Sequence, residues 1–174
     1  MAKVFERAEI VRQEEIAPGI YSMLLKTKAA VSAIPGQFIS VYSNDESHLL
    51  PRPISICEIF PEKEQLRIVY RIAGEGTREF SKYRSGDSVK ILGPLGNGYT
   101  LLNREALIIG GGIGIPPMLE LAKELKGPKT MVLGYRSNDT FLLESFKGLG
   151  DIYIASDDGS IGIKGTVIDA IKDS

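Results

Sequence analysis

Residues 106–118 read Ala-Leu-Ile-Ile-Gly-Gly-Gly-Ile-Gly-Ile-Pro-Pro-Met. An apolar run is followed by a glycine-rich turn, and a helical pattern starts at once after it, with apolar side chains at Met118, Leu121, Ala122 and Leu125. A strand, a glycine turn and a helix in this order bring backbone N–H groups and the positive end of a helix to a phosphate. The segment therefore predicts a nucleotide-binding α/β unit. Tight packing of the strand against the helix, with no ligand, explains the glycines less well.

The spacing of these glycines departs from the usual dinucleotide fingerprint. Gly110–Gly114 does not follow the pattern G-x-G-x-x-G, and Pro116-Pro117 stands where a third glycine would open the helix. Proline is tolerated in a first helical turn, since the N–H groups there have no helical partner. The phosphate-binding prediction therefore depends on the succession of elements.

The second half of the chain has continuous apolar runs of the kind found in parallel strands covered on both faces. These runs are Ala106–Ile109, Met131–Leu133 and Ile152–Ala155, with helical patterns between them. A further helix is expected to start near Thr166, with Asp169 placed to complete a capping box. We predict an incomplete parallel α/β domain over residues 104–174, because the last helix is not followed by a strand.

The first hundred residues alternate between apolar and polar side chains. Leu66, Ile68 and Tyr70 are interleaved with Arg67 and Arg71, as in a half-buried antiparallel strand. Gly and Pro turns separate six such segments, and a helical piece over residues 77–83 interrupts them. The predicted fold is all-β plus α/β: a six-stranded antiparallel β-barrel over residues 1–100, followed by the α/β domain.

Composition excludes several classes of function. The 174 residues are 43% hydrophobic and carry a net charge of −1, with no basic stripe for nucleic acid and no apolar run long enough to span a membrane. No signal peptide is apparent, which predicts a cytoplasmic protein. The single cysteine, Cys57, is expected to be buried and inert, and the single histidine, His48, to lie in a solvated loop. We predict no metal site in this sequence.

Three further segments carry side chains suited to a nucleotide. Arg52-Pro53-Ile54-Ser55 pairs a guanidinium, which can bind phosphate through two donors, with a small hydroxyl. Gly74–Thr77 is a glycine turn that opens a helix, with Thr77 expected as its cap. Asp157 follows the third apolar run, where a carboxylate can accept hydrogen bonds from a ribose. Taken singly, the first segment also fits a surface arginine at a strand start, and the other two fit plain turns.

The order of these motifs resembles the ferredoxin–NADP reductase superfamily over essentially the whole chain. The most similar branch is the electron-transfer subunit of type B dihydroorotate dehydrogenase. The residues that fit this branch are Arg52–Ser55, Gly93-Pro94-Leu95-Gly96-Asn97-Gly98, Asp157-Asp158-Gly159-Ser160 and Lys164-Gly165. Many members of the superfamily have Tyr where Ile54 stands, so the stacking on that face of the flavin must differ here.

The resemblance implies a role for each candidate residue. Arg52 would bind the FAD pyrophosphate together with backbone N–H groups of Gly76 and Thr77, and Ser55 would approach flavin N5 as the catalytic residue. The remaining cofactor-binding residues implied by the resemblance are Pro53, Ile54, Val69, Tyr70, Arg71, Gly111, Gly112, Gly114 and Asp157. NAD(P) would be the substrate, and hydride would pass between its nicotinamide and the flavin.

The resemblance also implies a two-iron two-sulfur cluster and a partner, an FMN-containing catalytic subunit that oxidises dihydroorotate in pyrimidine biosynthesis. Cys57 alone cannot ligate such a cluster, so the cluster is expected only in a longer, full-length protein, and this chain alone is expected to be inactive. Two alternatives stay open: a subunit passing electrons between NAD(P)H and ferredoxin, and a binding module without flavin.

Overall fold

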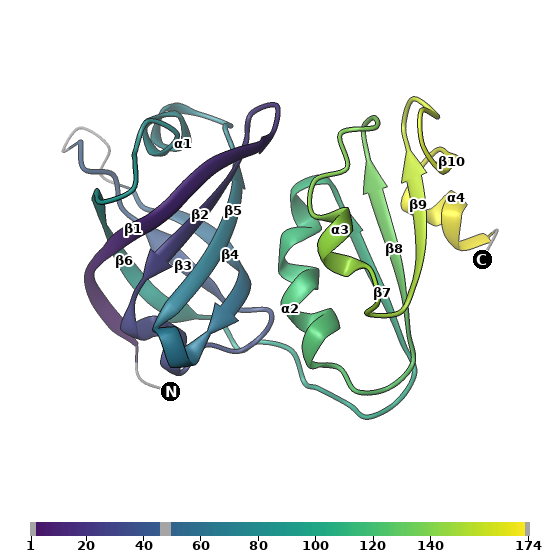
Figure 1. Cartoon of the computed structure of the whole chain (residues 1–174), viewed down its shortest axis with the longest axis horizontal. Coiled ribbons are helices and arrows are strands. Elements are labelled where there is room, and N and C mark those ends of the chain that lie inside the picture. The colour runs from purple at the N-terminus through teal and green to yellow at the C-terminus, as the bar shows by residue number, and fades with distance from the viewer. Residues whose placement is uncertain (1–2, 46–49, 173–174) are drawn as a thin grey trace. The chain divides into compact units, whose positions relative to one another are not determined.

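The computed structural model describes residues 3–45 and 50–172. The chain divides into two compact units, Met1–Tyr99 and Thr100–Ser174. We call them the barrel unit and the sheet unit (Figure 1). His48 lies outside the described residues.

The barrel unit is a closed antiparallel barrel of six strands in the order β1-β2-β5-β4-β3-β6. The strands are β1 (Val4–Ala17), β2 (Ile20–Lys26), β3 (Phe38–Val41), β4 (Arg52–Phe60), β5 (Gln65–Arg71) and β6 (Ser88–Leu95), with short 3-10 helices at Lys28–Val31 and Pro61–Lys63. Alternate side chains fill the interior, as the alternation in the sequence predicts, and closure leaves no free strand edge. The predicted six-stranded barrel is therefore confirmed.

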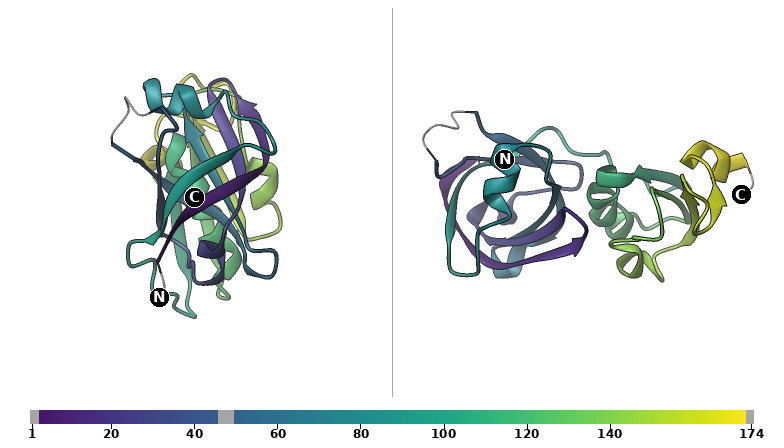
Figure 2. Two further views of the ribbon diagram at one scale, coloured as in Figure 1. Left: turned by 90° about the vertical axis from the view of Figure 1, so that its left-hand side faces the viewer. Right: turned by 90° about the horizontal axis from the view of Figure 1, so that it is seen from above.

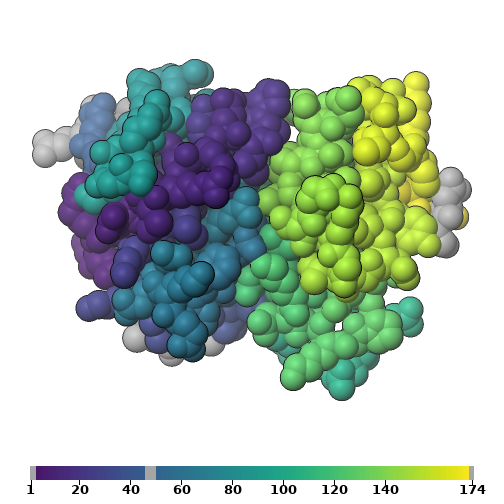
Figure 3. Space-filling model, in the orientation of Figure 1, coloured from purple at the N-terminus to yellow at the C-terminus, as the bar shows by residue number. Residues whose placement is uncertain are grey.

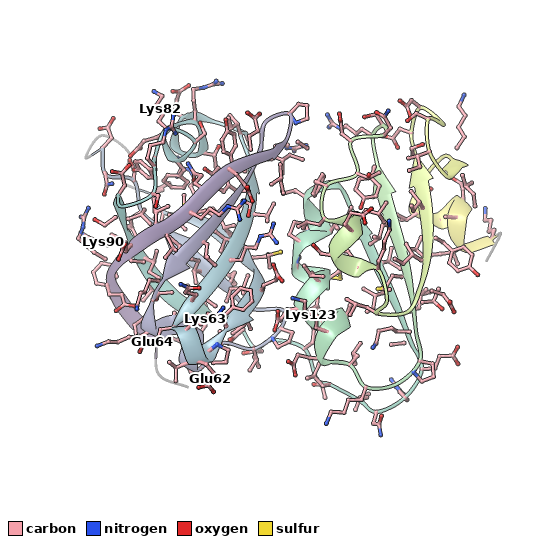
Figure 4. All side chains as sticks on the ribbon, viewed as in Figure 1. Glu62, Lys63, Glu64, Lys82, Lys90 and Lys123 are labelled. Atoms are coloured by element: carbon pink, nitrogen blue, oxygen red, sulfur yellow. The ribbon has the colours of Figure 1, made fainter. Side chains whose placement is uncertain are left out.

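One end of the barrel is covered by α1 (Glu75–Phe80), which lies across the ring of strands in the view from above (Figure 2). Phe80 is fully buried in the barrel core, where its ring meets Tyr70 edge to face. The side chain of Gln13 on β1 donates to the backbone carbonyls of Phe80 and Tyr83, both at 2.9 Å. Side-chain sticks show Lys82, just after α1, at this end, and Glu62, Lys63 and Glu64 at the opposite end (Figure 4).

The sequence placed this helix at residues 77–83, which is wrong at both ends. The helix begins after Gly74, whose extended backbone makes it the N-cap, so Thr77 is the third helical residue and not the cap. The Thr77 hydroxyl accepts instead from the N–H groups of Ala73 and Gly74, at 2.9 and 3.2 Å. The side chain of the third helical residue can reach back to the N–H of the N-cap, as Thr77 does here.

The sheet unit is a four-stranded parallel sheet in the order β10-β9-β8-β7. Its elements are β7 (Ala106–Gly111), a 3-10 turn (Gly112–Gly114), α2 (Pro116–Glu124), β8 (Lys129–Tyr135), α3 (Leu143–Phe146), β9 (Asp151–Ser156), β10 (Ile163–Lys164) and α4 (Val167–Lys172). The three apolar runs form β7, β8 and β9, as expected. The two-residue strand β10 was not predicted, because two residues are too few to show a pattern.

Helices cover both faces of this sheet. A Cβ on Gly110 of β7 would face α2. A Cβ on Gly134 of β8 would point to the other face of the sheet, where it meets Val167 of α4. Both glycines leave too little room for a Cβ atom, so they permit close packing of helix on strand. Asp169 accepts from the Thr166 N–H and hydroxyl, both at 2.8 Å, which confirms the predicted cap of α4.

Candidate functional site

The arginine motif and the glycine–threonine motif meet at one end of the barrel. Arg52 opens β4, and its guanidinium lies against the backbone of Gly76 in the first turn of α1. A Cβ atom at position 76 would lie 2.9 Å from Arg52 Nε and 3.1 Å from its Cζ. Arg52 also donates from a terminal nitrogen to the Leu50 carbonyl at 2.5 Å. These contacts hold a cationic fork beside the helix start.

Backbone geometry adds further donors to this place. The first N–H groups of a helix have no carbonyl within the helix to accept them, and the helix dipole makes this end positive. Gly76 is buried, and in the space-filling view the surface of α1 is the teal region beside β1 (Figure 3). A fixed guanidinium beside such N–H groups is suited to a diphosphate.

Alternation along β4 decides which side chains of the arginine motif face outward. Pro53 and Ser55 are exposed, whereas Ile54 is 7% exposed and belongs to the barrel core. Ser55 pairs across the strands with Phe38 on β3. The Ser55 hydroxyl is therefore presented to solvent, while Ile54 can offer a ligand little more than its backbone.

The three candidate residues on β5 also differ in how far their side chains are exposed. Tyr70 is 3% exposed, stacks on Tyr21 with ring centroids 5.8 Å apart, and donates its hydroxyl to Gln13 at 3.0 Å. Burial and the neighbouring tyrosines raise its pKa above the usual value, so the phenol stays neutral. Val69 is also buried, and Arg71 is exposed. Of the three, only Arg71 presents its side chain freely to a ligand.

In the sheet unit, the four glycines at the end of β7 and in the turn after it fall into two groups. A Cβ atom on Gly110 would lie 3.0 Å from the Ile115 Cα, so this glycine is required by packing. Gly111, Gly112 and Gly114 have no atom within 4 Å of such a Cβ, although Gly112 has a φ of +51°, which favours glycine. Packing therefore does not explain Gly111 and Gly114, and their bare backbone leaves space for a ligand beside the uncapped start of α2.

The other candidate of this unit lies at the same edge of the sheet. Gly111 pairs with Gly134, and Gly134 pairs with Ala155, so the carboxyl ends of β7, β8 and β9 are level. Asp157 follows β9 and is exposed, and its N–H donates to the Tyr135 carbonyl at 3.2 Å. The structure thus brings Gly111–Gly114 and Asp157 to the edge where parallel sheets bind ligands.

Two residues outside these motifs also bear on the site. Cys57 is fully buried, as expected. Glu79 on α1 was not predicted as a site residue, and its carboxylate accepts hydrogen bonds from residues 43–45. Its position three residues after Gly76 was the one available signal, since residues three apart share a helix face.

The described part of the chain contains neither a cluster of metal ligands nor a helix suited to cross a membrane. Among residues 3–45 and 50–172, no group of three or more His, Cys, Asp or Glu side chains is arranged to hold a metal ion. Over the same residues, no helix is both long and apolar enough to cross a membrane.

Curated relatives share much of this sequence. The chain is 42% identical to the dihydroorotate dehydrogenase B (NAD(+)) electron transfer subunit of Streptococcus pneumoniae R6, over 97% of the chain and 69% of the relative. It is 44% identical to the subunit of the same name from Streptococcus mutans, over 94% of the chain and 68% of the relative. No family model matches the sequence.

Solved structures show the same fold. An NADH-dependent reduced ferredoxin–NADP oxidoreductase, studied for flavin-based electron bifurcation, superposes with a TM-score of 0.88 at 30% identity, over 95% of this chain and 62% of that one. Phthalate dioxygenase reductase superposes with a TM-score of 0.69 at 23% identity, over 89% of this chain and 52% of that one. The chain therefore belongs to the family of dihydroorotate dehydrogenase B electron transfer subunits, oxidoreductases with the ferredoxin–NADP reductase fold.

Proposed function

We propose that the barrel unit binds FAD and that the sheet unit binds a pyridine nucleotide, so that the protein passes electrons between NAD(P) and a partner. The contact between Arg52 and Gly76 carries this proposal, because it forms a cradle of cationic and N–H donors that a single Cβ atom would fill. The residues present therefore fit the diphosphate of FAD. When bound, the flavin supplies the redox chemistry, since it can exchange hydride with a nicotinamide and single electrons with a metal cluster.

The chain's own residues bind and orient. Arg52 and the first-turn N–H groups of α1 would hold the diphosphate, and the exposed Ser55 hydroxyl would approach the N5 edge of the flavin. In the sheet unit, Gly111–Gly114 receive the phosphates of the pyridine nucleotide, and Asp157 accepts hydrogen bonds from its ribose. In this proposal residues 1–100 are the FAD-binding domain and residues 104–174 the domain for the pyridine nucleotide.

The electron partner we propose is a dihydroorotate dehydrogenase catalytic subunit, with an iron–sulfur cluster between the two flavins. The names of the relatives at 40–44% identity support the partner. One cysteine cannot ligate a two-iron cluster, so in this proposal the cluster ligands lie outside this sequence. A second candidate, electron exchange with ferredoxin, is supported by the match to the ferredoxin–NADP oxidoreductase at 30% identity.

A visible spectrum and a titration test the proposal. Purified chain reconstituted with FAD should show the bands of bound oxidised flavin near ~370 and ~450 nm. A protein that stays colourless and binds no added FAD would instead fit a module without flavin. To separate the two partners, the chain is used as bait: an FMN-containing barrel subunit supports dihydroorotate oxidation, and a second iron–sulfur flavoprotein supports the ferredoxin reaction.

A further inference from the structure

Glu79 on α1 binds residues 43–45, which follow β3. Its Oε1 accepts the backbone N–H groups of Asn44 and Asp45, at 2.9 and 3.3 Å, and also the Tyr83 hydroxyl. Its Oε2 accepts the Ser43 hydroxyl. One carboxylate on α1 thus binds three consecutive residues that follow β3.

The same segment is also fixed to the barrel wall. The Asn44 side-chain amide donates to the Ser88 carbonyl on β6 at 3.0 Å, and its Oδ1 accepts from Arg7 on β1 at 3.1 Å. Arg7 in turn donates to the Ser88 hydroxyl at 3.1 Å. Glu79 therefore connects α1 to a segment that β1 and β6 already hold in place.

The far end of the β3–β4 connection reaches the same helix. Arg52, at the start of β4, lies against Gly76 and binds the Leu50 carbonyl. Gly76 and Glu79 are three residues apart, so they lie on one face of α1. The beginning of the connection is held at Glu79 and its end at Gly76, one turn apart on a helix of six residues.

We propose that Glu79 is a positioning residue for the diphosphate end of the cofactor site: by fastening α1 to residues 43–45, it fixes Gly76 and the helix start beside the Arg52 guanidinium. The inference rests on the proposed binding of FAD and adds a residue to that site. A carboxylate on this face of α1 would by its charge repel a diphosphate. If Glu79 favours FAD binding, it must do so through its hydrogen bonds. Removing Glu79 should then weaken FAD binding, whereas loss of charge repulsion alone would tighten it.

The test compares variants by their dissociation constants for FAD and for riboflavin, which shares the ring system and lacks the diphosphate. Glu79→Ala should weaken FAD about tenfold, roughly the lower value of one hydrogen bond to a charged group, while the constant for riboflavin changes little. Glu79→Gln keeps one acceptor oxygen and should fall between wild type and Glu79→Ala. Glu62→Ala is the matched control, because it removes an exposed carboxylate at the opposite end of the barrel, away from α1 and Arg52.

Each outcome decides the inference. Wild-type FAD affinity in Glu79→Ala, tighter binding, or equal losses for FAD and riboflavin would overturn it. Should Glu79→Ala not fold, Ser43→Ala and Glu79→Gln replace it, and both must lower the ratio of riboflavin to FAD dissociation constants. If Arg52→Ala weakens FAD but the Glu79 variants do not, this inference alone fails. If the wild-type chain binds no FAD, the proposed function fails and the inference fails with it.

Discussion

The guanidinium of Arg52 occupies the space that a side chain at Gly76 would take, with only 2.9 Å between Arg52 Nε and a Cβ placed on that glycine. Arginine and glycine therefore depend on each other here. A larger residue at position 76 would displace the arginine, since the three atoms nearest to a Cβ there all belong to Arg52. Neither the start of β4 nor the turn before α1 alone forms the arrangement that we propose for the diphosphate.

Gly76→Ala should lower FAD affinity more than it lowers stability. The added methyl group meets the flexible end of an arginine, which can move aside, so the fold is retained while the guanidinium leaves the helix start. We expect FAD binding about tenfold weaker, measured by quenching of flavin fluorescence. Gly74→Ala is the control, because a Cβ there has nothing within 4 Å and the backbone is extended, with φ of −173°. Equal losses in both variants would contradict the arrangement.

Replacing Arg52 should affect FAD according to how much of its donor fork remains. Arg52→Ala removes charge-assisted hydrogen bonds worth roughly 1.5–3 kcal/mol, which predicts an affinity about ten- to hundredfold lower. Arg52→Lys keeps the charge but loses the paired donors, so its affinity for FAD should lie between those of wild type and Arg52→Ala. Arg12→Ala, which removes an exposed arginine paired with Glu14, should bind like wild type. An Arg52→Ala chain with unaltered affinity in the same titration would rule out the phosphate-binding role.

The sequence predicted the barrel and the parallel sheet because their periodicities are long enough to read. Alternation at Leu66, Ile68 and Tyr70 requires one face of a strand to be buried, and the apolar run 106–109 requires both to be buried. The strand β10 and the ends of α1 could not be predicted, since they depend on one or two residues. Capping by Thr77 from within the helix depends on its geometry, which the sequence alone does not specify.

Residue patterns alone did not bring the parts of the site together, although the family resemblance assigned Arg52, Gly76 and Thr77 to one pyrophosphate. Arg52 and Gly76 each suggested an anion, but their contact depends on how β4 and α1 close the same end of the barrel. No sequence pattern singled out Glu79, because its partners Asn44 and Asp45 are far away along the chain. Every residue except proline carries a backbone N–H, so composition and periodicity do not show which of these groups Glu79 will bind.

The stabilising effect of Glu79 should disappear at low pH. Burial raises the pKa of this carboxyl, but the hydrogen bonds from Ser43, Tyr83 and the Asn44 and Asp45 backbone outweigh burial and hold it below its ordinary 4.5. A carboxyl with a lowered pKa stabilises the fold above its unfolded-state pKa and loses this effect as pH falls through the folded-state value. The difference in unfolding midpoint between wild type and Glu79→Gln, which cannot titrate, should be constant above about pH 5 and shrink below it. A difference that widens on acidification would contradict this assignment.

Substitutions at Gly110 and Gly114 should separate the stability of the sheet unit from its affinity for NADH. Gly110→Ala should destabilise the unit by roughly 1–3 kcal/mol, because its Cβ would lie 3.0 Å from the Ile115 Cα and 3.3 Å from the Gly114 carbonyl oxygen, both backbone atoms that cannot rotate away. Gly114→Ala adds a Cβ with nothing within 4 Å, at a position without positive φ, so its unfolding midpoint should match wild type. The same methyl group would occupy the space we assign to a phosphate, so affinity for NADH should fall about tenfold or more. Thermal unfolding and NADH titration of both variants measure the two effects. Unchanged NADH binding by Gly114→Ala would mean that the loop's open backbone does not hold the nucleotide.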